Sequence, residues 1–173
     1  TIEPWVATEW ESNEDGTEWI FTIRDDVYFH SGRHCTAYDF EATFDRLLDT
    51  ENPVRYTERF SYIESAVAAD DYTFVITLAE PKAFFLQSIA DQATAVLNPE
   101  YIEKYGSDLG ETAESVDGCG PFKCTGWTRG EEMRFERFDD YYGDVAKTRE
   151  IVMMIVPEQT SRAIAIETGQ ADI

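Results

Sequence analysis

The sequence predicts a mixed fold of the α/β (α+β) class, because strand-like and helix-like segments alternate along its length. Residues 19–24 alternate apolar and polar side chains, which is typical of a half-buried strand. Residues 36–48 instead place apolar side chains at helical spacing. Residues 151–156 are apolar throughout and precede a helical pattern over 158–168. That combination indicates a strand covered on both faces in an α/β layer.

The composition indicates a globular protein with an acidic surface. Hydrophobic residues make up 43% and aromatic residues 14% of the chain, too many for a disordered segment. The 35 acidic and 14 basic residues give a net charge of −21. Such a surface repels phosphate backbones and anionic lipid, so nucleic-acid and membrane-surface roles are disfavoured. The charge is compatible with cationic or zwitterionic solutes, and solubility in an ionic medium explains it as well.

The first half of the chain is predicted to form a small antiparallel unit. A short strand over 27–29 follows the strand at 19–24. Thr36 then opens the helix as its cap, with Asp39 near the positive end of the helix dipole. Two further strands, over 63–69 and 73–78, are joined by an acidic turn.

Two shorter helices and a second strand region follow. One helix begins at Pro81, and another begins at Asn98 and Pro99 and ends at Gly106. Further on, a hairpin is expected with strands over 122–128 and 132–138. The last residues, 171–173, are expected to begin another strand.

The cysteines and histidines predict no metal site. The count of three cysteines, Cys35, Cys119 and Cys124, allows at most one internal disulfide, and their spacing does not match a zinc motif. Small buried thiols are expected, with a Cys119–Cys124 bridge as the alternative. A turn separates His30 from His34, so we expect two independent loop histidines.

Paired acidic residues raise a carboxylate-dependent hydrolase as an alternative function. Such an enzyme needs two carboxylates that face each other across a cleft, about 5–9 Å apart. Sequence neighbours on a strand point to opposite faces, and these pairs stand beside turns, so solvated turn residues are the favoured interpretation. We therefore expect neither catalysis nor a cofactor. The pairs are Asp25-Asp26, Asp70-Asp71, Glu131-Glu132 and Asp139-Asp140.

A collinear series of short motifs runs along almost the whole chain. In order they read EWE (9–11), EDGT (14–17), FTIRD (21–25), VYFHSG (27–32), TAYDF (36–40), DYTFVITL (71–78), GCGPFK (118–123), DYYG (140–143) and ETGQADI (167–173). The series resembles family 5 of the extracellular solute-binding proteins, the peptide/nickel/opine receptors of ABC importers. In that family "TAxDF" and "GTGPY/FK" are typical.

The resemblance implies a periplasmic-binding-protein type II fold, in which two lobes close on a ligand around a hinge. Full members are considerably longer, so the chain resembles a fragment: an accessory α+β subdomain over 1–95 and part of lobe one over 96–173, truncated before the second lobe. The implied function is capture of oligopeptides or similar small solutes by lobe closure, as the non-enzymatic substrate-binding component of an importer. A ligand-sensing module on the same fold is the further alternative.

The resemblance also implies partners and a location. The partners are a peptide or other small solute and the permease subunits of an ABC transporter. The protein is expected outside the cytoplasm, in the periplasm or as a cell-surface lipoprotein. Any membrane anchor would lie outside this chain.

The residues expected to face the ligand lie in loops. Because Cys119 stands where the family has threonine, the ligand class does not transfer with the resemblance. Positions after the 151–156 strand are included because ligands sit off the carboxyl ends of strands. Ordinary loop packing would explain the same positions. The expected ligand-binding residues are Tyr56, Gln92, Ala93, Thr94, Gly118, Cys119, Gly120, Gln159 and Thr160.

Overall fold

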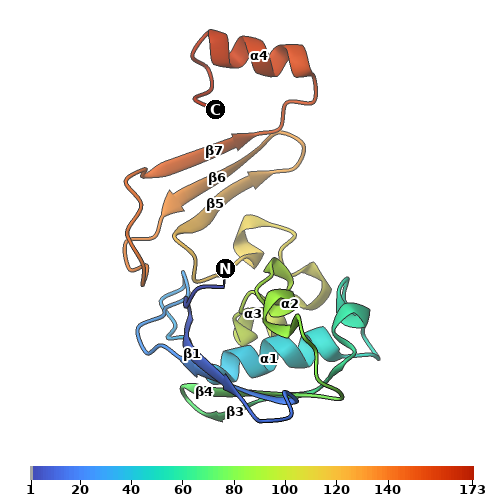
Figure 1. Cartoon of the computed structure of the whole chain (residues 1–173). Helices are drawn as coiled ribbons and strands as arrows, with labels where there is room; N and C mark the ends of the chain where they lie inside the picture. The colour runs from blue at the N-terminus through green and yellow to red at the C-terminus, as the bar shows by residue number, and fades with distance from the viewer. Residues whose placement is uncertain (1) are drawn as a thin grey trace.

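Two antiparallel sheets contain the strands of residues 2–173, which the computed structural model describes (Figure 1). The first sheet has four strands in the order β1-β2-β4-β3, and the second has three in the order β5-β6-β7. The strands are β1 (Ala7–Ser12), β2 (Glu18–Ile23), β3 (Ile63–Asp70), β4 (Thr73–Leu78), β5 (Phe122–Thr128), β6 (Glu132–Arg137) and β7 (Glu150–Met154).

The helices are short apart from α1, which lies against the four-stranded sheet (Figure 1). None of those in the described part of the chain has the length and apolar character needed to cross a membrane. Several 3-10 turns lie between them. The α-helices are α1 (Ala37–Leu48), α2 (Phe85–Ile89), α3 (Pro99–Tyr105) and α4 (Gln159–Glu167).

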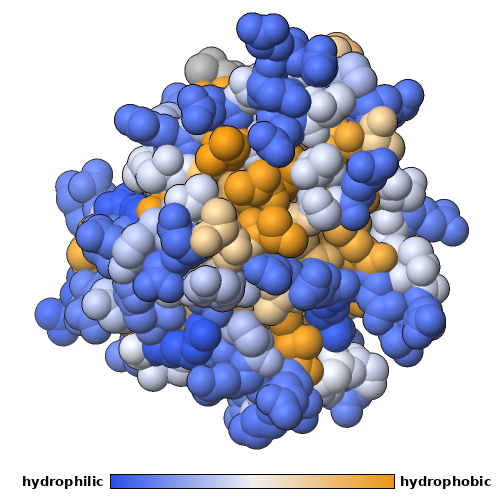
Figure 2. Space-filling view, turned by 90° about the horizontal axis from the view of Figure 1, so that it is seen from below, coloured by the Kyte–Doolittle hydropathy of each residue, from blue (hydrophilic) through white to orange (hydrophobic). Residues whose placement is uncertain are grey.

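Packing of α1 on the four-stranded sheet forms the main hydrophobic core. The ring of Phe74 on β4 lies 5.7 Å from that of Phe40 and 5.4 Å from that of Phe44, both on α1. These contacts confirm the predicted apolar stripe of the helix. Seen from below, the side of the molecule that carries this sheet is mostly hydrophilic around a central hydrophobic area (Figure 2).

The start of α1 depends on a buried carboxylate. Thr36 is the N-cap residue, and its backbone N–H donates to Asp39 over 2.7 Å. Asp39 is fully buried and also pairs with Arg33. The predicted helix start is thus confirmed, with the acid of the first turn satisfying one of the free N–H groups.

Strand β1 was not predicted from the sequence. It pairs only with β2, at the edge of the sheet, and its side chains are exposed except for the half-buried Ala7 and Trp10. An edge strand with so few apolar positions carries a weak alternation signal. The predicted strand over 27–29 is reduced to one isolated bridge between Tyr28 and His34.

The prediction that residues 151–156 are covered on both faces is wrong for the described residues. β7 is the outer strand of the second sheet, paired with β6 alone, and Met153 is 56% exposed. Few side chains pack against β7. Most of its apolar side chains are therefore exposed, although their pattern is typical of a buried strand. α4 is likewise left uncovered, with Ile164 and Ile166 exposed, and residues 171–173 form no strand.

The proposed division between 1–95 and 96–173 stays a prediction. The four-stranded sheet lies before it and the three-stranded sheet after it. A second apolar cluster joins residues from both parts: Val27, Phe29 and Cys35 pack with Val96, and Cys119 packs against them.

Removing the Phe74 ring tests the main core. Phe74→Ala is expected to lower the free energy of unfolding by about 3–5 kcal/mol, because it leaves a cavity between β4 and α1. Val67→Ala on β3 is the matched control: Val67 is 45% exposed, and its loss should cost about 0.5 kcal/mol or less. Urea unfolding followed by circular dichroism measures both, and equal losses would contradict the assignment of the core.

Candidate functional site

The glycine loop, residues 118–120, borders two adjoining cavities. The larger has a volume of about 600 Å³ and the smaller about 390 Å³. Gly118 lines both. All three loop residues line the larger cavity, and the loop reaches the smaller one at Gly118.

Six of the predicted ligand-binding residues meet at these walls. Gly118, Cys119, Gly120 and Thr94 line the larger cavity, and Tyr56, Ala93 and Gly118 line the smaller. The fold thus brings the segments around residues 56, 94 and 119 together.

The other three predicted residues lie elsewhere. Gln92 is exposed and lines neither cavity. Gln159 and Thr160 begin α4, which lies at the far end of the second sheet from α1–α3 (Figure 1). Both side chains are exposed and line neither cavity.

The larger cavity offers mainly apolar surface. Its walls include Trp10 of β1, Phe40 of α1 and the neighbouring rings of Tyr141 and Tyr142, whose centroids are 4.6 Å apart. The hydroxyl of Thr94 already donates to backbone carbonyls, with the Ile89 oxygen at 2.5 Å. The cavity can take an apolar group, and the Thr94 hydroxyl on its wall is already bonded within the chain.

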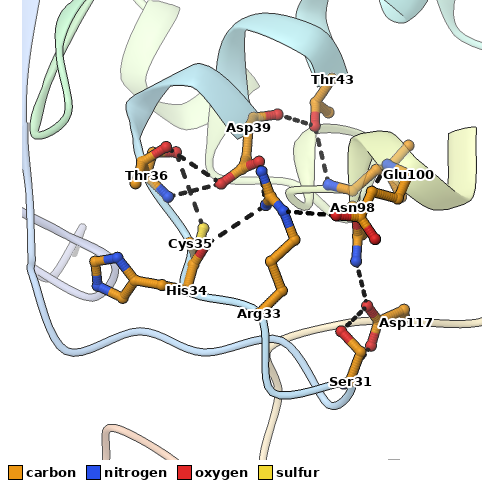
Figure 3. A network of polar contacts seen from close by, with 11 residues as sticks. Ser31, Arg33, His34, Cys35, Thr36, Asp39, Thr43, Asn98, Glu100 and Asp117 are labelled. Carbon is orange, nitrogen blue, oxygen red and sulfur yellow. Dashed lines mark hydrogen bonds and ion pairs between the residues drawn. The ribbon is translucent and has the colours of Figure 1, made fainter.

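Asp117 fixes the start of the glycine loop. Asp117 is only 7% exposed, and its carboxylate accepts three hydrogen bonds from two distant segments (Figure 3). The backbone N–H of Ser31 donates over 2.9 Å, its hydroxyl over 2.7 Å, and the side-chain amide of Asn98 over 2.6 Å. Asn98 also accepts from the N–H of Glu100 and so caps α3.

His30 holds the loop at both ends. Its backbone N–H donates to the Gly118 carbonyl over 2.8 Å, and its ring Nε2 lies 2.9 Å from the Gly120 carbonyl. A carbonyl can only accept, so Nε2 carries a proton, and in the neutral ring Nδ1 then has none. Nδ1 is buried and has no partner among the described residues. Burial lowers the pKa of His30.

A second polar network ties the cavity wall to α1. The hydroxyl of Thr43 donates to the Asp39 carbonyl over 2.7 Å and accepts from the Leu97 N–H over 2.9 Å (Figure 3). The segment that leads into α3 is therefore anchored on the first core. Together the two networks hold the glycine loop and the segment before α3 in place.

The positioning residues His30, Ser31 and Asp117 were absent from the predicted set. Asp117 adjoins the GCGP motif, and His30 and Ser31 lie in VYFHSG. Both motifs carried the family resemblance, but nothing local indicates that they touch, since Ser31 and Asp117 are 86 residues apart.

The described residues give no support to the metal-site or hydrolase alternatives. They contain no group of three or more side chains able to hold a metal ion. All three cysteines are free, and burial raises the pKa of Cys119 to about 11, which keeps it a thiol near neutral pH. The acidic pairs lie at exposed turns apart from the half-buried Glu132, so nothing supports the hydrolase alternative.

Comparison with known proteins gives one consistent result. Residues 1–173 match the family described as "Bacterial extracellular solute-binding proteins, family 5 Middle". The probable D,D-dipeptide-binding periplasmic protein DdpA of Escherichia coli K12 is 29% identical over 175 residues, which is 99% of this chain and 33% of DdpA. The glutathione-binding protein GsiB of Salmonella typhimurium is 28% identical over 167 residues, 96% of this chain and 32% of GsiB.

A solved structure agrees with these relatives. The periplasmic binding protein DppA from Helicobacter pylori, in complex with the peptide STSA, superposes with a TM-score of 0.88 at 30% identity. The match covers 98% of this chain and 37% of DppA. The chain thus spans about a third of the length of the relatives that it matches.

Asp117 can be tested by removing its charge. Asp117→Asn places an amide where donors of Ser31 and Asn98 converge, and we expect it to lower the free energy of unfolding by about 2 kcal/mol. Asp140→Asn, at an exposed position, is the control and should change stability by about 0.5 kcal/mol at most. Urea unfolding measures the difference, and indistinguishable variants would contradict the role of Asp117.

His30 predicts a pH dependence of stability. Since burial lowers the pKa of His30 in the folded chain, the unfolded chain binds this proton more readily. The contribution is fully present above the ordinary histidine pKa of about 6.5, and stability falls as the pH drops below it. His30→Gln keeps an N–H donor without a titrating ring and should flatten the profile from about pH 7.5 to about pH 5.5. Unfolding free energies across this range measure it; an unchanged slope would exclude His30 as the source.

Proposed function

Because the chain belongs to family 5 of the bacterial extracellular solute-binding proteins, we propose that it is part of the substrate-binding component of an ABC importer. It captures oligopeptides or similar small solutes by lobe closure and is not an enzyme. The family match over the whole chain carries this proposal. The hydrogen-bonded glycine loop described above supports it.

The proposed ligand class follows from the named relatives. DdpA is named for D,D-dipeptides, GsiB for glutathione, and DppA was solved with the peptide STSA. All three are short peptides or peptide-like. The identity is below one third in each case, and Cys119 departs from the family's threonine, so the proposal stays at this class.

The glycine loop serves as one wall of the ligand site in this proposal. It is held rigidly by His30 and Asp117, and its small residues allow a solute to approach the backbone closely. The opposite wall comes from a second lobe, outside the third of the relatives that this chain matches. A ligand that touches both lobes favours the closed state by its differential affinity for that state.

The partners and location are proposed on the same basis. The permease subunits of an ABC transporter receive the captured solute. DdpA is named a periplasmic protein, and we place this protein outside the cytoplasm as well, in the periplasm or as a lipoprotein at the cell surface. Of the predicted ligand contacts, the six at the cavity walls form the proposed site, and Gln92, Gln159 and Thr160 have no support from their positions.

Filling the space beside the glycine loop tests the proposed wall. A Cβ atom added at Gly120 would meet no atom within 4 Å, so Gly120→Leu is expected to fold while its side chain obstructs the ligand. In the complete receptor that carries this chain, we expect the affinity for the tetrapeptide Ser-Thr-Ser-Ala or a dipeptide to fall at least about tenfold, which corresponds to about 1.4 kcal/mol. Isothermal titration calorimetry measures it.

The control is Gly126→Ala in β5, where an added methyl group meets only ordinary contacts with Arg134 and lines neither cavity. Its affinity should match that of the unmodified receptor. Chain 1–173 alone, without the second lobe, should bind the same peptides weakly or not at all. Micromolar binding by the chain alone would contradict lobe closure, and unchanged binding by Gly120→Leu would exclude the glycine loop as the wall.

A further inference from the structure

Two of the three cysteines share one apolar cluster. Cys35 is fully buried with Val27, Phe29 and Val96, and Cys119 packs against the same cluster. The two residues are far apart in the sequence, just before α1 and in the glycine loop. That shared packing is therefore a product of the fold.

The backbone keeps both cysteines attached to the same short segment, residues 27–35. The N–H of Cys35 donates to the Val27 carbonyl over 2.9 Å, and the carbonyl of Gly118, next to Cys119, accepts from the His30 N–H over 2.8 Å. Burial is the main cause that raises the pKa of Cys35, and its neighbours Asp39 and Cys119 raise it further.

Cys124 is placed differently. It lies on β5, where its thiol is half-buried and faces the Gly126 carbonyl of the same strand, 3.7 Å away. It does not belong to the cluster around Cys35. Cys119 therefore shares its surroundings with Cys35, although Cys124 is closer to it in the sequence.

We propose that Cys35 and Cys119 are a redox pair that closes to a disulfide and fastens the glycine loop to the segment before α1. The inference rests on the proposed location outside the cytoplasm, because disulfides form and persist in oxidising compartments. It replaces the Cys119–Cys124 bridge that the sequence left as an alternative. The closed pair would hold one wall of the proposed ligand site in a fixed position.

A low-molecular-weight disulfide, R–S–S–R, supplies the oxidant. Cys119 lines the larger cavity and is the thiol that such a molecule reaches first. Its thiolate attacks one sulfur, forming a mixed disulfide and releasing RS⁻. The thiolate of Cys35 then attacks the Cys119 sulfur and displaces the second RS⁻. Two protein thiols are oxidised, and R–S–S–R is reduced to two R–SH, which take up the two protons.

The protonation state of the Cys119 thiol sets the rate of this reaction. Burial raises the pKa of Cys119 to about 11, and only the thiolate attacks. The thiolate fraction, and with it the rate of closure, should rise about tenfold for each pH unit in the range below that pKa. For a pair of surface thiols with ordinary pKa values, the rate would level off at a lower pH.

The experiment uses the reduced 173-residue chain incubated with oxidised glutathione. We expect thiol titration in denaturant to find one remaining thiol, that of Cys124. Trypsin cuts between Cys119 and Cys124 at Lys123, so non-reducing mass spectrometry can tell the pairings apart. The expected product joins peptide 34–46 to peptide 105–123. The melting temperature should rise by on the order of 10 °C and return on reduction.

Cys124→Ser is the matched variant, and it should form the same linked peptides and show the same rise. Cys119→Ser should form no linked peptide. The proposal is overturned if three thiols remain, if Cys119 stops at a mixed disulfide with glutathione, or if Cys124 appears in the linked product. None of these readouts involves a ligand, so the outcome is independent of whether the receptor binds peptides.

Discussion

The buried carboxylate of Asp117 is the interaction on which the candidate site depends. A carboxylate out of contact with water is strongly disfavoured unless donors surround it. Here the donors are Ser31 and Asn98, which lie 86 and 19 residues away in the sequence. The glycine loop therefore takes its position only when both segments are in place. Because His30, beside Ser31, then binds the carbonyls at both ends of the loop, one buried charge organises the whole wall.

The same hydrogen bonds limit what this wall can offer a solute. The carbonyls of Gly118 and Gly120 are occupied by His30, and the Thr94 hydroxyl donates to its own segment. The lining of the larger cavity is mainly apolar and aromatic, and it also includes the thiol of Cys119 and the acidic residues Glu3 and Asp91.

The two halves of the chain differ in how fully they are packed. α1 and the four-stranded sheet bury a continuous core of their own, whereas β7 and α4 leave large apolar side chains exposed, Met153 and Ile166 among them. The sequence pattern of 151–156 correctly indicated a strand. It could not indicate which surface covers that strand, because periodicity records only the character of each face and not its neighbour. The cluster that joins Cys35 to Cys119 links the two halves near the site.

The sequence by itself determined the elements with strong local signals: the alternation in β2 and β4, the stripe of α1 and the hairpin of β5 and β6. It also carried the motif order on which family membership rests. It missed β1, whose polar edge position weakens the alternation. Only the tertiary structure decided that residues near 56, 94 and 119 meet, that Gln159 and Thr160 lie apart, and that Asp117 is held by Ser31. The physical reason is that a buried carboxylate needs donors from any direction in space, and a local pattern cannot specify which distant segment supplies them.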